Sequence, residues 1–291
     1  FFMREKFLHY LTFEKRYSEH TTLAYAQDLM QFEGFLEENQ LELISVKHLH
    51  VRSWIVSLIE NGMTNKSVNR KLACLRTFYK WLRKEGLMDT NPIQKIQGPK
   101  NEKRLPVFAK ESELKHERIQ GVFGEDFEGK RDELMFELFY QTGIRLSELI
   151  HLKDVDVVDG RIKVLGKRNK ERLIPIASNL FSSIQVFIAK KRRLLGDTPS
   201  LLVLKNGNKM YPAFVYRKIN YYLSVVTSLD KKSPHVLRHT FATHMLNRGS
   251  GLETLKDLLG HANLSATQVY THNSFAQLTQ IYSQAHPRGH K

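Results

Sequence analysis

The sequence predicts a mainly α-helical protein with one small antiparallel β-sheet. Apolar residues recur at helical spacing through most of the chain, and short β-rich runs occur only between residues 155 and 176. A third observation divides the chain. Its 291 residues exceed the usual size of one domain, and the helical pattern stops at 91–106, a polar, basic stretch punctuated by Pro and Gly. We therefore expect an all-helical domain at 1–90, a linker at 91–106 and an α+β domain at 107–291.

The first domain is expected to hold four helices. One of them, at 47–59, has apolar residues at i, i+3, i+4, i+7 and i+8. The fourth, which ends before Gly86, keeps an apolar stripe and is the most basic of the four. Three of its cations are candidate contacts with a polyanion, although a solvated helix face explains them equally well: Arg70, Lys71 and Arg76.

The charge of the chain favours a polyanionic partner. It carries 45 Lys and Arg residues against 30 Asp and Glu residues, a formal net charge of +15. Nucleic acid is favoured over a membrane, because no predicted helix combines a basic face with a strongly apolar one. The sequence has no apolar run long enough to cross a bilayer and no signal-peptide pattern, so we expect a cytoplasmic protein with no membrane partner.

No cofactor and no metal are expected. The single cysteine, Cys74, excludes an internal disulfide and a cysteine-rich zinc site. The 13 histidines include no His-Glu-x-x-His motif and no Cys/His cluster.

The second domain opens with helices, of which 127–140 is apolar enough to be buried. This helix ends at Thr142-Gly143. Arg145 follows at the turn into a new helix, with Glu148 three residues later. Two interpretations stay open: a surface ion pair at i,i+3, or a Glu148 that orients a partly buried Arg145 toward a phosphate.

Three short strands follow this helix. They are expected at 155–158, 161–165 and 171–176, with the first turn at Asp159-Gly160. The second turn carries three cations, which could lie in solvent, reach into a groove or deliver a proton: Lys167, Arg168 and Lys170.

The stretch from Ser233 to His272 gathers the side chains that most suggest a site. Ser233-Pro234 is a helix start, and His235 and Arg238 then lie on one face of the first turns, where free N–H groups favour an anion. His261 follows a helix stop at Gly260, and Tyr270 comes nine residues later. Two histidines, an arginine and a tyrosine at this spacing indicate a phosphate site.

Four motifs, in order, make up a pattern that is similar to a known family. They are Thr-Gly-Ile-Arg-Leu-Ser-Glu-Leu at 142–149, Gly-Lys-Arg-Asn-Lys-Glu-Arg at 166–172, His-Val-Leu-Arg-His-Thr-Phe-Ala-Thr-His at 235–244 and Leu-Leu-Gly-His-Ala-Asn-Leu-Ser-Ala-Thr-Gln-Val-Tyr-Thr-His at 258–272. The set resembles the tyrosine site-specific recombinases of the phage integrase family, and within it the bacterial Xer subgroup of XerC/XerD type. The resemblance spans nearly the whole chain. It implies a SAM-like core-binding domain followed by a catalytic domain.

The resemblance also implies a role for each site residue. In the family a tyrosine attacks a DNA phosphodiester and forms a 3′-phosphotyrosyl link, a role that falls to Tyr270. The implied partners of this nucleophile are two arginines for the phosphate oxygens, a general acid/base histidine, a hydrogen-bonding histidine and a lysine for the leaving oxygen: Arg145, Arg238, His235, His261 and Lys167. Lys170 remains an alternative for the lysine.

The implied activity is recombination through a Holliday junction, with resolution of chromosome dimers at a dif-like site. The implied assembly on double-stranded DNA is a homo- or hetero-tetramer joined by the C-terminal helix at 274–284, with a septal DNA translocase as a candidate activator. Docking of that helix in its own domain is the alternative to exchange. For function, a mobile-element integrase and a non-catalytic DNA-binding protein remain alternatives.

Overall fold

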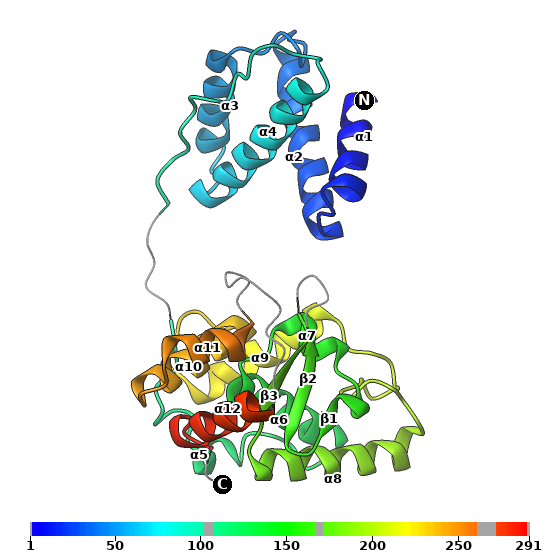
Figure 1. The fold of residues 1–291 in the computed structure, drawn as a ribbon, viewed down its shortest axis with the longest axis vertical. Helices are drawn as coiled ribbons and strands as arrows, with labels where there is room; N and C mark the ends of the chain where they lie inside the picture. Colours follow the sequence, from blue (N-terminus) through cyan, green and yellow to red (C-terminus); the bar gives the residue numbers. More distant parts are fainter. Residues whose placement is uncertain (1, 102–106, 167–170, 261–271, 290–291) are drawn as a thin grey trace. The chain divides into compact units, whose positions relative to one another are not determined.

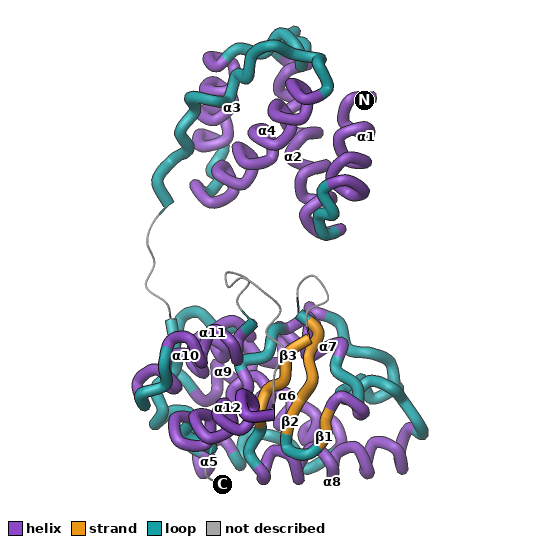
Figure 2. The backbone as a smooth tube through the Cα atoms, viewed as in Figure 1, coloured by secondary structure: helices purple, strands orange, loops and turns teal. Residues whose placement is uncertain are grey.

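The computed structural model describes residues 2–101, 107–166, 171–260 and 272–289. The chain divides into two compact units, Phe1–Arg104 and Leu105–Lys291. Helices dominate both units, and the strands that the structure describes form one sheet in the second unit (Figure 2). The predicted fold class, mainly helical with a small antiparallel sheet, is confirmed. No helix within the described ranges is long and apolar enough to cross a membrane.

The first unit is helical in all of its regular elements. Ser18 and Thr64 each begin a helix, because their side-chain oxygens accept hydrogen bonds from the backbone N–H groups of Thr21 and Ser67. The elements of this unit (Figure 1) are α1 (Phe2–His9), a π-helix (Tyr10–Glu14), α2 (Glu19–Glu38), α3 (His48–Glu60) and α4 (Asn65–Lys84).

Part of the predicted linker belongs to the core of the first unit. Ile93 and Ile96 are buried with the apolar side chains of the helices. Arg76 of α4 donates a hydrogen bond of 2.8 Å to the carbonyl oxygen of Ile96, and Asn69 donates one of 2.8 Å to that of Pro99. The two isoleucines anchor this Pro- and Gly-containing stretch to α4, so its first part is not a free linker.

The second unit combines helices with a three-stranded sheet. Its helices before the sheet are α5 (His116–Ile119), α6 (Phe127–Thr142) and α7 (Leu146–His151), followed by a 3-10 turn (Asp154–Asp156). The strands are β1 (Val157–Val158), β2 (Arg161–Leu165) and β3 (Glu171–Pro175). The later helices are α8 (Ser178–Leu195), α9 (Pro212–Val226), α10 (Pro234–Asn247), α11 (Leu252–Leu259) and α12 (His272–Ala285).

The sheet has the order β1-β2-β3 and is antiparallel throughout. Asp159 and Gly160 connect β1 to β2 with φ values of 48° and 70°, as a tight hairpin turn requires. In β2 and β3, Ile162 lies opposite Ile174, and both are buried. Arg172 lies opposite Val164 and is also buried, so one position of the inward face carries a charge.

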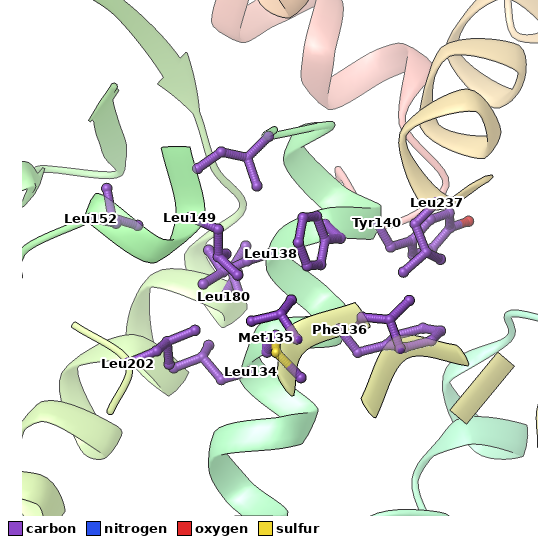
Figure 3. Close-up of a cluster of buried hydrophobic side chains, with 14 of the residues drawn as sticks. Leu134, Met135, Phe136, Leu138, Tyr140, Leu149, Leu152, Leu180, Leu202 and Leu237 are labelled. Carbon is purple, nitrogen blue, oxygen red and sulfur yellow. The ribbon is translucent and has the colours of Figure 1, made fainter. Parts of the chain in front are cut away.

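Helix α6 forms the centre of the second unit. Every residue from Leu134 to Thr142 is buried, which is typical of a helix that is covered on all sides. Figure 3 shows its side chains together with Leu149 of α7, Leu180 of α8 and Leu237 of α10, which belong to the same apolar cluster. The helix ends at Gly143 with φ 61°. A Cβ atom there would lie 2.6 Å from the Phe241 ring and 2.8 Å from Leu259, so glycine allows α6, α10 and α11 to meet closely.

Helix α12 docks on its own unit, beside β3, α10 and α11 (Figure 1). Leu278 and Tyr282 are buried with Phe241 and Leu255. After the helix, Arg288 is buried and donates a hydrogen bond of 2.7 Å to the carbonyl oxygen of Leu114. In this single chain the tail therefore adopts the alternative of docking in cis.

Replacing Tyr282 by alanine is expected to lower the free energy of unfolding by about 3–5 kcal/mol, because a large side chain that is 1% exposed leaves a cavity. Chemical denaturation measures this change. Gln277→Ala, on the exposed side of α12, is the control and should change stability little. Docking in cis also requires that the unfolding midpoint of wild type be independent of protein concentration. A midpoint that rises with concentration would instead indicate exchange of α12 between subunits.

Candidate active site

Arg145 is held at the junction between α6 and α7. Its backbone N–H donates to Glu148 Oε2 at 2.8 Å, so the glutamate caps α7. Its Nη1 donates to Glu148 Oε1, also at 2.8 Å. The Arg145 side chain keeps 25% exposure, whereas the Glu148 side chain keeps 3%. The geometry matches the interpretation in which a buried glutamate orients a partly buried arginine.

Glu148 has a second partner, Arg172 of β3. Arg172 Nη1 donates to Glu148 Oε1 at 2.7 Å, and Nη2 donates to Oε2 at 2.9 Å, as in a bidentate ion pair. Burial by itself would raise the pKa of Glu148. The hydrogen bonds and positive charge of Arg172, followed by those of Arg145, outweigh burial and lower the pKa to about 2. Glu148 is therefore a permanent anion near neutral pH.

Arg238 of α10 connects the ends of two other helices. Its Nη1 donates to the carbonyl oxygen of Gly143, and its Nη2 donates to that of Leu259 at 2.7 Å. Burial, then the positive charges of Arg145 and Arg172, lowers the pKa of Arg238 to about 10. The guanidinium is still protonated at neutral pH. The guanidiniums of Arg145, Arg172 and Arg238 therefore lie near a single carboxylate, that of Glu148. The excess of positive charge favours the binding of an anion.

The two candidate arginines meet at the end of α11. Arg145 Nη2 donates to the carbonyl oxygen of Gly260 at 2.7 Å, one residue beyond the carbonyl that Arg238 binds. In these side-chain contacts each arginine uses two of its five N–H groups. The remaining donors can serve the non-bridging oxygens of a phosphate.

His235 lies in the first turn of α10, three residues before Arg238, and is exposed. Partial burial of this side chain is the largest cause that lowers its pKa, and interactions with the neighbouring side chains of His239, Arg238 and Lys231 lower it further. The imidazole is therefore neutral at neutral pH and can accept a proton. Ser233 precedes the helix and Pro234 occupies its first turn, as predicted, but the serine side chain makes no capping hydrogen bond.

The other catalytic candidates, Lys167, His261 and Tyr270, lie outside the described residues, as do the hairpin cations Arg168 and Lys170. Their assignments stay predictions. The structure does place the residues beside them: β3 begins at Glu171, and Gly260, directly before His261, accepts the hydrogen bond from Arg145. Among the residues described, no group of three His, Cys, Asp or Glu side chains gathers as a metal site would.

Two of the three candidate contacts of the first unit pair with a buried acid, Asp28. Lys71 is 3% exposed, and its Nζ lies 2.7 Å from Asp28 Oδ1. Arg70 also pairs with Asp28, while its side chain stays 45% exposed. Arg76 is exposed but donates to the carbonyl of Ile96. Lys71 therefore has a structural partner, and contact of these three cations with DNA stays a prediction.

Arg172 is the site component that sequence reasoning did not single out. It lies within a quoted motif, but the candidates that the sequence suggested there are the cations of the second turn. A signal existed in the strand pattern: Arg172 has the same phase as the apolar Ile174, so a strand here places an arginine on the buried face. A buried arginine requires a partner, which could have been sought among the acids of the other motifs.

Comparison with known proteins identifies the family. The profile described as "Phage integrase family" matches residues 113–277, and that described as "Phage integrase, N-terminal SAM-like domain" matches residues 5–86. The chain is 39% identical to "Tyrosine recombinase XerC" of Staphylococcus epidermidis, over 99% of this chain and 98% of that protein. It is 34% identical to "Tyrosine recombinase XerC" of Chlorobaculum parvum, over 97% and 94%.

Solved structures agree on the fold. One is the XerH site-specific recombinase bound to a palindromic difH substrate, with a TM-score of 0.72 and 21% identity, over 90% of this chain and 79% of that chain. Another is a lambda integrase dimer bound to a COC′ core site, with a TM-score of 0.69 and 17% identity, over 92% and 98%. With two matching domain profiles in order and full-length relatives above a third identity, this chain belongs to the phage integrase family and is a tyrosine recombinase of the XerC type.

Proposed function

We propose that this recombinase cuts and rejoins double-stranded DNA at a dif-like site through a covalent 3′-phosphotyrosyl intermediate, and that it thereby resolves chromosome dimers. One observation carries the chemical part of the proposal: Arg145 and Arg238 are fixed together by the carbonyls of Leu259 and Gly260. The biological part is supported by the relatives named XerC and by the net charge of +15.

The reaction divides into two similar steps. The hydroxyl oxygen of Tyr270 attacks the phosphorus of a backbone phosphodiester, a bond forms between tyrosine and the 3′-phosphate, and the 5′-oxygen leaves as a hydroxyl. The phosphotyrosyl bond conserves the energy of the broken bond. A 5′-hydroxyl from a second duplex then attacks the phosphotyrosine, which reseals the strand and releases the tyrosine without ATP. Exchange of one strand pair produces a Holliday junction, and exchange of the second pair resolves it.

The two arginines stabilise the charge that develops during attack. Negative charge grows on the non-bridging oxygens in the transition state, and donors that are already in place lower its energy most. Arg145 and Arg238 are fixed by hydrogen bonds to Glu148, Gly143 and the end of α11, so they need little reorganisation when the phosphate binds. A planar guanidinium can bind two oxygens through parallel N–H groups on two nitrogens, a geometry that the single nitrogen of a lysine cannot reproduce.

Proton transfer requires separate groups. A tyrosine with a pKa of about 10 is mostly protonated at neutral pH, so attack needs a proton acceptor. His235 suits this role because its lowered pKa keeps it neutral. Lys167, with Lys170 as the alternative, is proposed to protonate the leaving 5′-oxygen, and His261 to add a hydrogen bond to the phosphate.

Binding and assembly complete the proposal. Arg70, Arg76 and Lys71 of the first unit and Arg168 of the hairpin turn are candidate contacts with the DNA backbone. Four subunits are proposed to assemble on two duplexes, with α12 passing between neighbours in place of its docking in cis. The activator is proposed to be a septal DNA translocase.

A covalent adduct tests the central claim. A duplex selected by the purified protein from a random-sequence pool, and nicked near the cleavage position, should trap a protein–DNA species that survives SDS. A protein that binds the duplex but forms no adduct would be a DNA-binding protein without this chemistry. Protection of genomic DNA tests the biological role, because a single site near the replication terminus supports dimer resolution and a site bordering an insertion supports a mobile-element integrase.

A further inference from the structure

The end of α11 carries three consecutive backbone carbonyls that accept hydrogen bonds from three different arginines. The last carbonyls of a helix have no partner within the helix and lie at the negative end of its dipole. In this protein they act as a row of acceptors for cations that come from three other elements. The three hydrogen bonds are Leu258 O from Arg172 Nε at 2.9 Å, Leu259 O from Arg238 Nη2 at 2.7 Å and Gly260 O from Arg145 Nη2 at 2.7 Å.

Arg172 differs from the other two arginines of this row. It is 5% exposed, and all three of its nitrogens bind protein groups: Nε binds the Leu258 carbonyl, and Nη1 and Nη2 bind Glu148. Gly260 packs directly on it, since a Cβ atom there would lie 3.1 Å from Arg172 Nη1. Arg172 is therefore enclosed by the protein and does not have the access to an anion that Arg145 keeps.

The contacts form a closed ring. Arg172 binds Glu148, and Glu148 binds Arg145. Arg145 binds the carbonyl oxygen of Gly260, and the backbone connects Gly260 to Leu258, whose carbonyl oxygen Arg172 binds. We infer that Arg172 is a positioning residue for strand cleavage, because it fixes Glu148 and the end of α11 and thereby aligns the guanidiniums of Arg145 and Arg238. This inference rests on the proposed function.

Loss of Arg172 would affect Arg145 in two ways. Glu148 would lose its bidentate partner while it stays buried, and its charge would draw Arg145 into closer pairing and away from a phosphate. The Leu258 carbonyl would lose its donor, so the end of α11 that also holds Arg238 could shift. A displacement of about 1 Å in a catalytic group can slow a reaction by about 10²-fold.

Lysine is not an adequate substitute at this position. Arg172 donates in two directions at once, to the carboxylate and to a carbonyl, through a rigid planar fork. The single nitrogen of a lysine keeps the charge but cannot reproduce that geometry. Arg172→Lys should therefore be defective as well, though less than Arg172→Gln.

The kinetic test uses DNA that is already bound. In single-turnover cleavage of the selected, nicked duplex, Arg172→Gln should be slower than wild type by about 10²-fold, with DNA affinity nearly unchanged. The matched control is Lys191→Met. Lys191 is also fully buried, lies 2.7 Å from Asp154 Oδ1 and donates to the Ser200 carbonyl, but it belongs to α8. This variant should lose thermal stability to a similar degree and cleave at the wild-type rate below its unfolding temperature.

A second measurement needs neither DNA nor catalysis. The Nη–H signals of a freely rotating guanidinium average in NMR spectra, whereas those of a fixed one stay separate. The separate signals of Arg145 should be present in wild type and in Lys191→Met and should merge in Arg172→Gln. Wild-type cleavage by Arg172→Gln, or unchanged Arg145 signals in that variant, would overturn the positioning role. Absence of adduct with wild-type protein would instead overturn the proposed function. The NMR measurement would still show whether Arg172 fixes the guanidinium of Arg145.

Discussion

Replacing Tyr270 by phenylalanine should abolish the covalent adduct with the nicked duplex while the variant still binds the DNA. Phenylalanine has nearly the same size as tyrosine but lacks the hydroxyl oxygen that forms the bond to phosphorus. SDS gel electrophoresis with labelled DNA measures the adduct, and a filter or gel-shift assay measures binding. This is the largest effect that we expect from a single substitution, because no bond can form without the nucleophile.

The control for this experiment makes the same chemical change elsewhere. Tyr221 of α9 is 59% exposed and lies outside the candidate site, so Tyr221→Phe should form as much adduct as wild type. An adduct formed equally by Tyr270→Phe would show that another residue is the nucleophile. Peptide mapping of the adduct would then identify that residue.

Replacing Arg238 by lysine should slow single-turnover cleavage by about 10²–10³-fold, which corresponds to about 3–4 kcal/mol of transition-state stabilisation. The charge stays, but the planar fork that binds Gly143 and Leu259, and that is proposed to bind the phosphate, is lost. DNA affinity should fall little, because the transition state carries more charge on the phosphate than the bound substrate does. Arg145→Lys should behave in the same way.

Arg248 at the end of the same helix supplies the matched control. It is exposed and pairs with Glu111 at 2.7 Å, so Arg248→Lys replaces the arginine that directly follows α10 without touching the candidate site. Its cleavage rate should equal that of wild type. A rate for Arg238→Lys that also equals the wild-type rate would contradict the role in charge stabilisation.

Glu148 should make the stability of the protein depend on acid pH. Its pKa is about 2 in the folded chain against an ordinary value of 4.5, so the ionised form stabilises the fold above pH 4.5 and this contribution is lost as the pH falls toward 2. This shift of the pKa corresponds to a contribution of roughly 3 kcal/mol to the free energy of unfolding. Glu148→Gln should therefore be less stable than wild type at neutral pH and lose less stability between pH 4.5 and 2. Denaturant unfolding across this range measures the effect, with the exposed Glu253→Gln as control. If the free energies of unfolding of wild type and Glu148→Gln fell by the same amount between pH 4.5 and 2, this role of Glu148 would be contradicted.

Local patterns allowed much of the fold to be predicted. The apolar spacing at 47–59 corresponds to α3 (His48–Glu60), and Asp159-Gly160 forms the expected hairpin turn. Such features depend on residues that are close in sequence, and their backbone preferences are strong enough to act alone. The burial of Ile93 and Ile96 was not predicted, because two apolar residues in a Pro- and Gly-containing stretch carry no periodicity.

The sequence by itself determined which chemical groups the protein has and their order along the chain, because the motifs around Arg145, Arg238 and Tyr270 are local patterns of residue type. Only the tertiary structure showed what holds Arg145 and Arg238. Glu148 and Arg172 are 24 residues apart, and Arg145 and Gly260 are 115 apart. Contacts over such separations depend on how α6, α10 and α11 pack around Gly143, where a single added Cβ atom would collide. Such packing depends on several segments of the unit together, so the residue pattern of a single segment does not predict it.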